Sequence, residues 1–204
     1  MDKKESLAII YDCAKRYKEN LAGRTLMFVY MDKHKRIGCL EVSFDASNFQ
    51  HLTGIETQEL TSREFYRCCI DKRLGMGQFK LSAKGTTVLK LQVLPMLVKP
   101  DMSANMLGNY DVMRPKLYTE KLTGNIKGCM GFVKGKGERY VPNTVLKEDI
   151  RDVSVKTARI ILTCRKDKED KEYKEIVYKA KNVAWDDIIQ KLNRNDIVRL
   201  IGKI

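Results

Sequence analysis

The spacing of apolar residues changes near Pro100, and this change restricts the folds available to the chain. Before Pro100, apolar side chains recur three or four positions apart, as at Leu7, Ile10, Tyr17 and Leu21, which predicts amphipathic helices. After Pro100, short β-prone segments alternate with turns rich in Gly, Lys and Asp. Helices that give way to short strands predict an α+β fold, with N-terminal helices and a hairpin before an antiparallel meander.

Helices are predicted at 6–21, 48–54, 61–74 and 82–98. Thr61 and Glu64 have the spacing of a capping box at a helix start, and Pro95 should bend or end the fourth helix. The β-forming runs TLMFVYM and IGCLEVSF flank the polar DKHKR and predict a hairpin. The later strands are predicted in LYTEKLTG, GCMGFVKG, RYVPNTVL, ARIILTCR and YKEIVYKA. A last helix at 186–192 precedes IVRLIGKI, which fits a strand or a short helix.

We expect one α+β domain over residues 1–204. It is helix-rich over 1–100, strand-rich over 101–181 and helical again over 182–204. The sequence has no internal repeat, and PDMSAN is the one place where a domain boundary could fall. Hydrophobic residues make up 43% of the chain, which is enough to form a buried core.

Positive charge is concentrated in two stretches of the chain. The formal net charge is +13. Residues 63–90 hold seven Lys or Arg against two acids, and residues 114–147 hold eight against two, so these stretches carry 11 of the 13 net charges. If the fold brings them to one face, that face attracts a polyanion such as RNA, with an affinity that falls as salt rises. The alternative is a basic protein without a dedicated binding surface.

The cysteines and the known catalytic motifs exclude several classes of protein. No two of the six cysteines have zinc-knuckle spacing, so we expect neither a structural zinc nor another cofactor. The sequence lacks a Walker loop, an HExxH motif and a nucleophile elbow. The segment MDKKESLAIIYD does not have the uninterrupted apolar stretch that is typical of a signal peptide, and no apolar run in the sequence approaches membrane-spanning length. We therefore expect a cytoplasmic protein with free thiols and no membrane partner.

The chain has two histidines, and one of them is a candidate for catalysis. His34 lies in the charged turn DKHKR and should be solvated. His51 lies in a short helix between Phe49 and Leu52, where it fits either a core or capping residue or a general acid or base. RNA cleavage does not need a metal, because the ribose 2′-hydroxyl can attack the adjacent phosphate once a side chain removes its proton. The residue types for such a reaction are present.

Four segments together resemble a known nuclease family. FDASNFQHLTGI, KLQVLPML, RPKLYTEKL and YVPNTVLKEDIRD occur in this order and are similar to a phage-associated family, the fourth subgroup of the barnase–EndoU–colicin–RelE-like group. The resemblance spans residues 24–181. It implies helices followed by a curved antiparallel sheet, and metal-independent RNA cleavage.

The resemblance also implies which residues form the site. His51 corresponds to a general base or acid, and Thr144 to a small hydroxyl residue on a strand that hydrogen-bonds the phosphate. Lys147 and Arg151 would neutralise the scissile phosphate, although Lys147 fits a surface charge equally well. The nucleic-acid-binding residues are predicted in and around the second cationic stretch: Arg114, Lys116, Tyr118, Lys134, Lys136 and Arg139. Tyr118 would stack a base or lend its hydroxyl, while a half-buried sheet tyrosine is its structural alternative.

Three functions therefore remain open. The first is a ribonuclease from a phage or mobile element, such as a toxin, for which an antitoxin or immunity protein would be a natural partner. The second is a nucleic-acid-binding or counter-defence protein on the same fold with an inactive site. The third is a protein-interaction module that blocks an acidic partner. An exposed edge strand in the meander could also pair with a second copy of the chain.

Overall fold

The computed structural model describes residues 1–114, 117–135, 137 and 139–202. The helices are α1 (Lys3–Asn20), α2 (Asn48–Thr53), α3 (Ser62–Ile70), α4 (Thr86–Leu97), α5 (Ile150–Val153), α6 (Trp185–Lys191) and α7 (Asn195–Ile201). The strands of the main sheet are β1 (Arg24–Met31), β2 (Ile37–Ser43), β5 (Met106–Tyr110), β6 (Lys121–Asn125), β7 (Gly128–Lys134), β8 (Tyr140–Leu146), β9 (Ser154–Asp167) and β10 (Glu175–Lys179). Two short strands, β3 (Glu56–Thr57) and β4 (Phe79–Lys80), pair separately.

The N-terminal helices form where the sequence predicts them, with different ends. The capping box at α3 is present, because Thr61 Oγ1 accepts from the Glu64 amide while Glu64 Oε2 accepts from the Thr61 amide. The helix ends at Ile70 instead of Leu74, since Lys72 has a left-handed φ of 54°. The fourth helix begins at Thr86, after Gly85 with φ 73°, and Pro95 lies in its last turn.

The sheet is curved, mixed and mostly antiparallel, which confirms the α+β class. The β1–β2 hairpin is confirmed, with Phe28 opposite Leu40. This early hairpin belongs to the same sheet as the later strands. Met106–Tyr110 forms β5, which the sequence did not indicate, and the ARIILTCR strand is longer than predicted as β9.

Among the described residues, the main sheet closes into a ring because β1 pairs with a strand on each of its two sides. Strand β1 pairs with β2 on one side and with β9 on the other, so the order runs β1-β2-β8-β7-β6-β5-β9 and returns to β1. The one parallel contact in this ring joins β2 to β8 at Val42 and Tyr140. Strand β10 pairs with β9 outside the ring.

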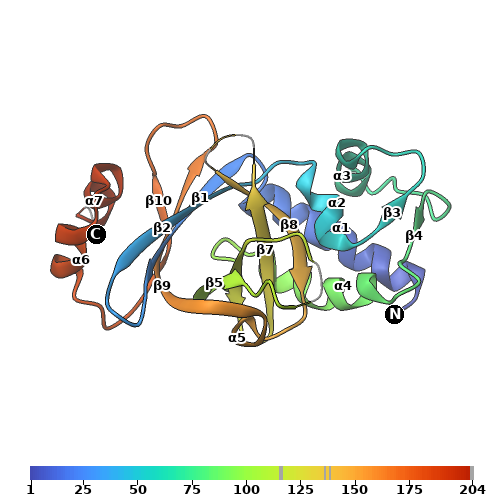
Figure 1. Cartoon of the computed structure of the whole chain (residues 1–204). Coiled ribbons are helices and arrows are strands. Elements are labelled where there is room, and N and C mark those ends of the chain that lie inside the picture. The colour runs from blue at the N-terminus through green and yellow to red at the C-terminus, as the bar shows by residue number, and fades with distance from the viewer. Residues whose placement is uncertain (115–116, 136, 138, 203–204) are drawn as a thin grey trace.

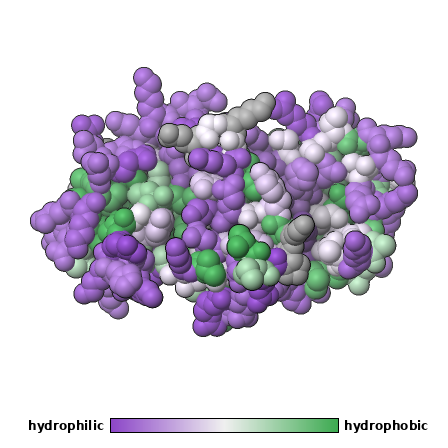
Figure 2. All heavy atoms as spheres, viewed as in Figure 1, coloured by the Kyte–Doolittle hydropathy of each residue, from purple (hydrophilic) through white to green (hydrophobic). Residues whose placement is uncertain are grey.

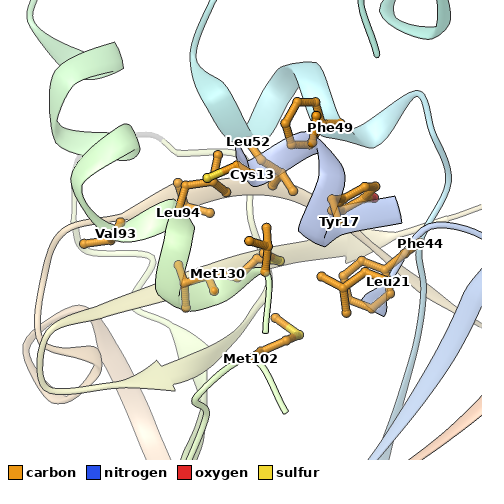
Figure 3. Packing of buried hydrophobic residues seen from close by; sticks show 14 of the residues in the cluster. Cys13, Tyr17, Leu21, Phe44, Phe49, Leu52, Val93, Leu94, Met102 and Met130 are labelled. Atoms are coloured by element: carbon orange, nitrogen blue, oxygen red, sulfur yellow. The ribbon is translucent and has the colours of Figure 1, made fainter. Parts of the chain in front are cut away.

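The largest core lies between α1–α4 and the strands. It includes Phe28 of β1, Met130 and Phe132 of β7, and Val145 of β8. Figure 3 shows Leu52 and Phe49 of α2 in this core, and the ring centroids of Phe49 and Tyr17 are 5.3 Å apart. This packing fixes α2 relative to the sheet.

The C-terminal residues form two helices over the other end of the sheet. In Figure 1, α6 and α7 lie at the opposite end of the molecule from α1–α4, with the strands between. Ile188, Ile197 and Ile201 bury their side chains in a second core with residues of β1 and β9. The segment IVRLIGKI, left open between strand and helix, is helical over its described part. No described helix has both the length and the apolar composition needed to cross a bilayer.

Candidate functional site

Helix α2 takes the place of a neighbouring strand at the edge of β8. In the described part of the chain, strand β2 pairs with β8 only at Val42 and Tyr140. Beyond that pair the chain leaves the sheet and forms α2, which packs against β8 (Figure 1). Because Phe49 and Leu52 point into the core, His51 is left on the exposed side of α2. The structure thus places the candidate histidine at the surface beside the edge of β8.

Helix α4 holds the C-terminal end of α2 through two side chains. Lys90 Nζ donates a hydrogen bond of 2.8 Å to the His51 carbonyl oxygen, and Thr87 Oγ1 donates one of 2.7 Å to the Gly54 carbonyl oxygen. These bonds satisfy carbonyl groups that have no partner within the helix. Gly54 has φ 67°, and a Cβ there would lie 2.9 Å from Lys90 Cδ. Any residue with a Cβ at position 54 would therefore displace the aliphatic stem of Lys90.

Burial lowers the pKa of Lys90 below its ordinary value, because desolvation disfavours the charged ammonium. The Lys90 ammonium is nevertheless fixed at the backbone of His51. It therefore adds positive charge at the backbone of His51, whose side chain is exposed.

Lys147, at the end of β8, contacts the same helix. Its Nζ donates a hydrogen bond of 2.7 Å to Gln92 Oε1, and Gln92 stands two residues after Lys90 in α4. We call His51, Lys90, Gln92 and Lys147 the α4 site. The two cationic stretches share this helix but not one of its faces, since Lys90 of the first stretch and Gln92, which binds Lys147 of the second, stand two residues apart and project in different directions.

Thr144 lies in β8 on the sheet face opposite to the main core. Its neighbour Val145 points into that core, and successive strand residues point to opposite faces. Thr144 is opposite Gly131 in the register. A Cβ at Gly131 would lie 2.8 Å from Thr144 Cγ2 and 2.5 Å from Thr119 Oγ1. Glycine at position 131 therefore allows the two threonines to approach each other closely.

The chain before β6 is fixed beside Thr144. Asn143 Nδ2 donates a hydrogen bond to the Tyr118 carbonyl oxygen. The Thr119 hydroxyl lies 3.2 Å from both the Phe132 carbonyl oxygen and Asn143 Oδ1. Tyr118 itself is 80% exposed, so the alternative of a half-buried sheet tyrosine is wrong.

Arg151 and Arg114 both form ion pairs. Arg151 Nε and Nη2 donate hydrogen bonds of 2.6 to 3.1 Å to the Asp149 carboxylate. These bonds lower the pKa of Asp149. Arg114 Nη1 lies 3.6 Å from Glu148 Oε2. Arg151 would have to leave Asp149 before it could bind a phosphate.

The remaining predicted nucleic-acid-binding residues lie farther along the β7–β8 hairpin or outside the described residues. Lys134, at the end of β7, is exposed. Arg139 Nε donates a hydrogen bond of 3.2 Å to Glu41 Oε2 on β2. Lys116 and Lys136 lie outside the described residues. Lys134 and Arg139 thus stay predictions for nucleic-acid binding, and Arg139 is already paired.

The family of the chain follows from a comparison with known proteins. It matches the model described as phage-Barnase-EndoU-ColicinE5/D-RelE like nuclease4 over residues 9–182. The chain belongs to this nuclease family. No curated protein and no solved structure matches it significantly.

Membership of this phage-associated nuclease family implies a nucleic-acid substrate. The match begins within α1 and ends after β10, so it includes every residue of the α4 site and leaves out α6 and α7. In the described part of the chain, no group of three or more His, Cys, Asp or Glu residues is placed to hold a metal ion.

Sequence reasoning missed four residues that shape this region of the nuclease. Lys90 and Gln92 were treated only as part of a charged stretch and of a helix, and Thr119 and Asn143 were not considered. A signal for the first two was present, because they are the polar positions in the otherwise apolar run VLKLQVLPML. A charged residue in such a run is seldom buried without a partner. Nothing comparable distinguishes Thr119 or Asn143 in the sequence.

Proposed function

We propose that the protein is a metal-independent endoribonuclease whose active site is built from the α4 site and Thr144. One observation carries the proposal: the hydrogen bond from Lys90 Nζ to the His51 carbonyl oxygen. This bond fixes the backbone of an exposed histidine at the edge of β8. The imidazole of that residue is a group that can move a proton, and Lys147 after β8 supplies positive charge for a phosphate.

The proposed reaction is an attack by the ribose 2′-hydroxyl on the neighbouring phosphorus atom. His51 removes the proton from the 2′-oxygen, the new O–P bond forms, and the bond from phosphorus to the 5′-oxygen breaks. The leaving 5′-oxygen takes a proton from solvent, to which His51 gives up the proton that it removed, so the products carry a 2′,3′-cyclic phosphate and a 5′-hydroxyl. Lys147 neutralises the phosphate, and the Thr144 hydroxyl hydrogen-bonds to it. Lys90 is a positioning residue that holds the backbone of His51.

The experiment compares the two histidines of the chain. Labelled tRNA, rRNA and mRNA are incubated with the protein in EDTA and separated by electrophoresis. His51→Ala should cut at least about 100-fold more slowly, which is the usual minimum for the loss of a general acid or base. His34→Ala is the matched control, because His34 lies in the β1–β2 turn, and its rate should equal that of the wild type.

Two results would refute the proposal. RNA left intact by the wild type in EDTA would exclude metal-independent cleavage of these RNAs. Equal cutting by His51→Ala and the wild type would exclude the site assignment. The ends of the products test the chemistry separately, since a 5′-phosphate would show that water, and not the 2′-hydroxyl, attacks.

A nucleic-acid-binding protein without catalysis is the second candidate. It is favoured by the ion pair of Arg151 with Asp149, which occupies a cation that the sequence assigned to the scissile phosphate. This function predicts RNA binding that weakens steeply as salt rises, with no product formed. Binding assays at increasing salt, run beside the cleavage gel, separate the two.

A further inference from the structure

Three large apolar side chains are exposed together between β5 and β6. Val112 is 88% exposed, Met113 is 89% exposed and Tyr118 is 80% exposed. We call these residues the apolar rim. Hydrophilic side chains cover most of the face shown in Figure 2, and hydrophobic ones form only small patches. Neighbouring apolar groups left in water on one short segment are typical of a binding surface.

The backbone on both sides of the apolar rim is anchored to the sheet. On one side, the Asp111 amide donates a hydrogen bond of 3.1 Å to the Val153 carbonyl oxygen, and Asp111 Oδ1 accepts one of 3.0 Å from the Met113 amide. On the other side, Asn143 holds the carbonyl group of Tyr118. The Tyr118 ring therefore projects into solvent from a fixed backbone. A fixed aromatic ring loses little conformational entropy when it binds a ligand.

The surroundings of the apolar rim suit a nucleotide. Val112, Tyr118 and Arg114 border a surface hollow of about 360 Å³. Arg114 pairs with Glu148, the residue that follows Lys147 of the α4 site. Tyr118 is fixed by Asn143, the residue before Thr144. The segment that carries the apolar rim thus contacts the chain of β8 on both sides of Thr144 and Lys147, the proposed phosphate-binding residues.

We propose that the apolar rim is a stacking subsite for an unpaired nucleobase, so that single-stranded or looped RNA is the substrate class. The inference rests on the proposed function and specifies its substrate. An exposed aromatic ring stacks on the face of a base whatever the sequence. Bases inside an RNA duplex have both faces covered by their neighbours, so a duplex offers no face to Tyr118. The flanking cations Arg114 and Lys147 complement the phosphates of the same strand.

Binding of an RNA that cannot be cut tests this subsite separately from catalysis. A fluorescein-labelled 2′-O-methyl RNA, which lacks the attacking hydroxyl, is titrated with protein in EDTA, as a single strand and as a duplex. Tyr118→Ala should weaken single-strand binding about tenfold, the size of one lost base–aromatic stack. Tyr118→Phe should bind like the wild type, because the ring is kept. Duplex binding should be weaker and the same for all variants.

Ile126→Ala is the matched control. Ile126 is 58% exposed in the turn at the other end of β6, and its loss should leave binding unchanged. Equal single-strand binding by Tyr118→Ala and the wild type would overturn the subsite. So would a duplex affinity that falls as much as the single-strand affinity, or a Phe variant as weak as the Ala variant. Intact Tyr118-dependent binding without any cleavage in EDTA would refute only the proposed catalysis.

Discussion

Gly131→Ala adds a single methyl group at the most crowded point beside the proposed site. The new Cβ would lie 2.5 Å from Thr119 Oγ1, 2.8 Å from Thr144 Cγ2 and 3.3 Å from Thr119 Cβ. Carbon atoms normally stay about 3.5 to 4 Å from non-bonded neighbours, so each threonine would have to retreat by about 1 Å. Thr119 and Thr144 are both buried, so their displacement would disturb the close packing around them.

The expected loss in the free energy of unfolding combines three terms. Overpacking costs about 1 to 3 kcal/mol, and displacement of the Thr119 hydroxyl from the Phe132 carbonyl oxygen costs about 1 kcal/mol more. The lower conformational entropy of the unfolded alanine chain returns about 0.4 to 1 kcal/mol. We expect a net destabilisation of about 2 kcal/mol, in line with large values for core substitutions.

Urea unfolding followed by circular dichroism measures this loss. With a slope of about 2 kcal/mol per molar urea, the midpoint should fall by about 1 M and the slope should not change. Gly77→Ala is the matched control, because a Cβ at Gly77 meets no atom within 4 Å, and its midpoint should be unchanged or slightly raised. An unchanged midpoint for Gly131→Ala would show that Thr119 and Thr144 do not pack against this glycine.

Three further predictions concern the α4 site and the buried thiols. Gly54→Ala should destabilise the protein by about 1 to 2 kcal/mol, because the left-handed φ of 67° at this position disfavours a Cβ. The substitution should also slow RNA cleavage, because the added methyl group displaces Lys90. An unchanged urea midpoint would contradict this prediction. Lys90→Met keeps the aliphatic stem but removes the ammonium, so RNA cleavage should fall about tenfold. The free energy of unfolding should stay within about 1 kcal/mol of the wild-type value, because the lost hydrogen bond and the relieved desolvation offset each other. Unchanged cleavage would exclude the positioning role of Lys90. Burial raises the pKa of four cysteine thiols from 9.0 to about 12, so the native state keeps protons that the unfolded state releases above pH 9. The contribution of these thiols to the free energy of unfolding should therefore be fully present below pH 9 and should be lost between pH 9 and 12, as measured by urea unfolding with a reducing agent. A urea midpoint that does not change over this pH range would contradict the burial of these thiols. They are Cys13, Cys69, Cys129 and Cys164.

Elements that depend on neighbours in sequence could be predicted from it. The apolar spacing located α1 and α4, and the Thr61–Glu64 capping box located the start of α3. Strands with many β-formers, such as β1 and β7, were also predicted. Strand β5 was missed because MLGNY combines a glycine and an asparagine, which have low strand propensity. Its conformation is fixed by pairing with β6 and β9.

The candidate site could be predicted only in part. The sequence indicated His51, Thr144 and Lys147 through resemblance to a nuclease family, and the family is confirmed. Their roles remain proposals. It did not indicate that Lys90 would bind the backbone of His51, since 39 residues separate them. Nor did it show that Asp149 would engage Arg151, because ion pairs across two residues depend on side-chain rotamers.

The sequence by itself determined the α+β class, the secondary-structure elements with strong periodicity, and the two cationic stretches. These properties follow from backbone propensity, side-chain spacing and charge, which act over a few residues. Only the tertiary structure decided that α2 replaces β2 at the edge of β8, that Lys90 binds the backbone of His51, and that Lys147 binds Gln92 of α4. It also decided that Tyr118 projects into solvent from a fixed backbone. Such placements depend on contacts between residues far apart in the chain, and local patterns carry no information about which distant partner a side chain will meet.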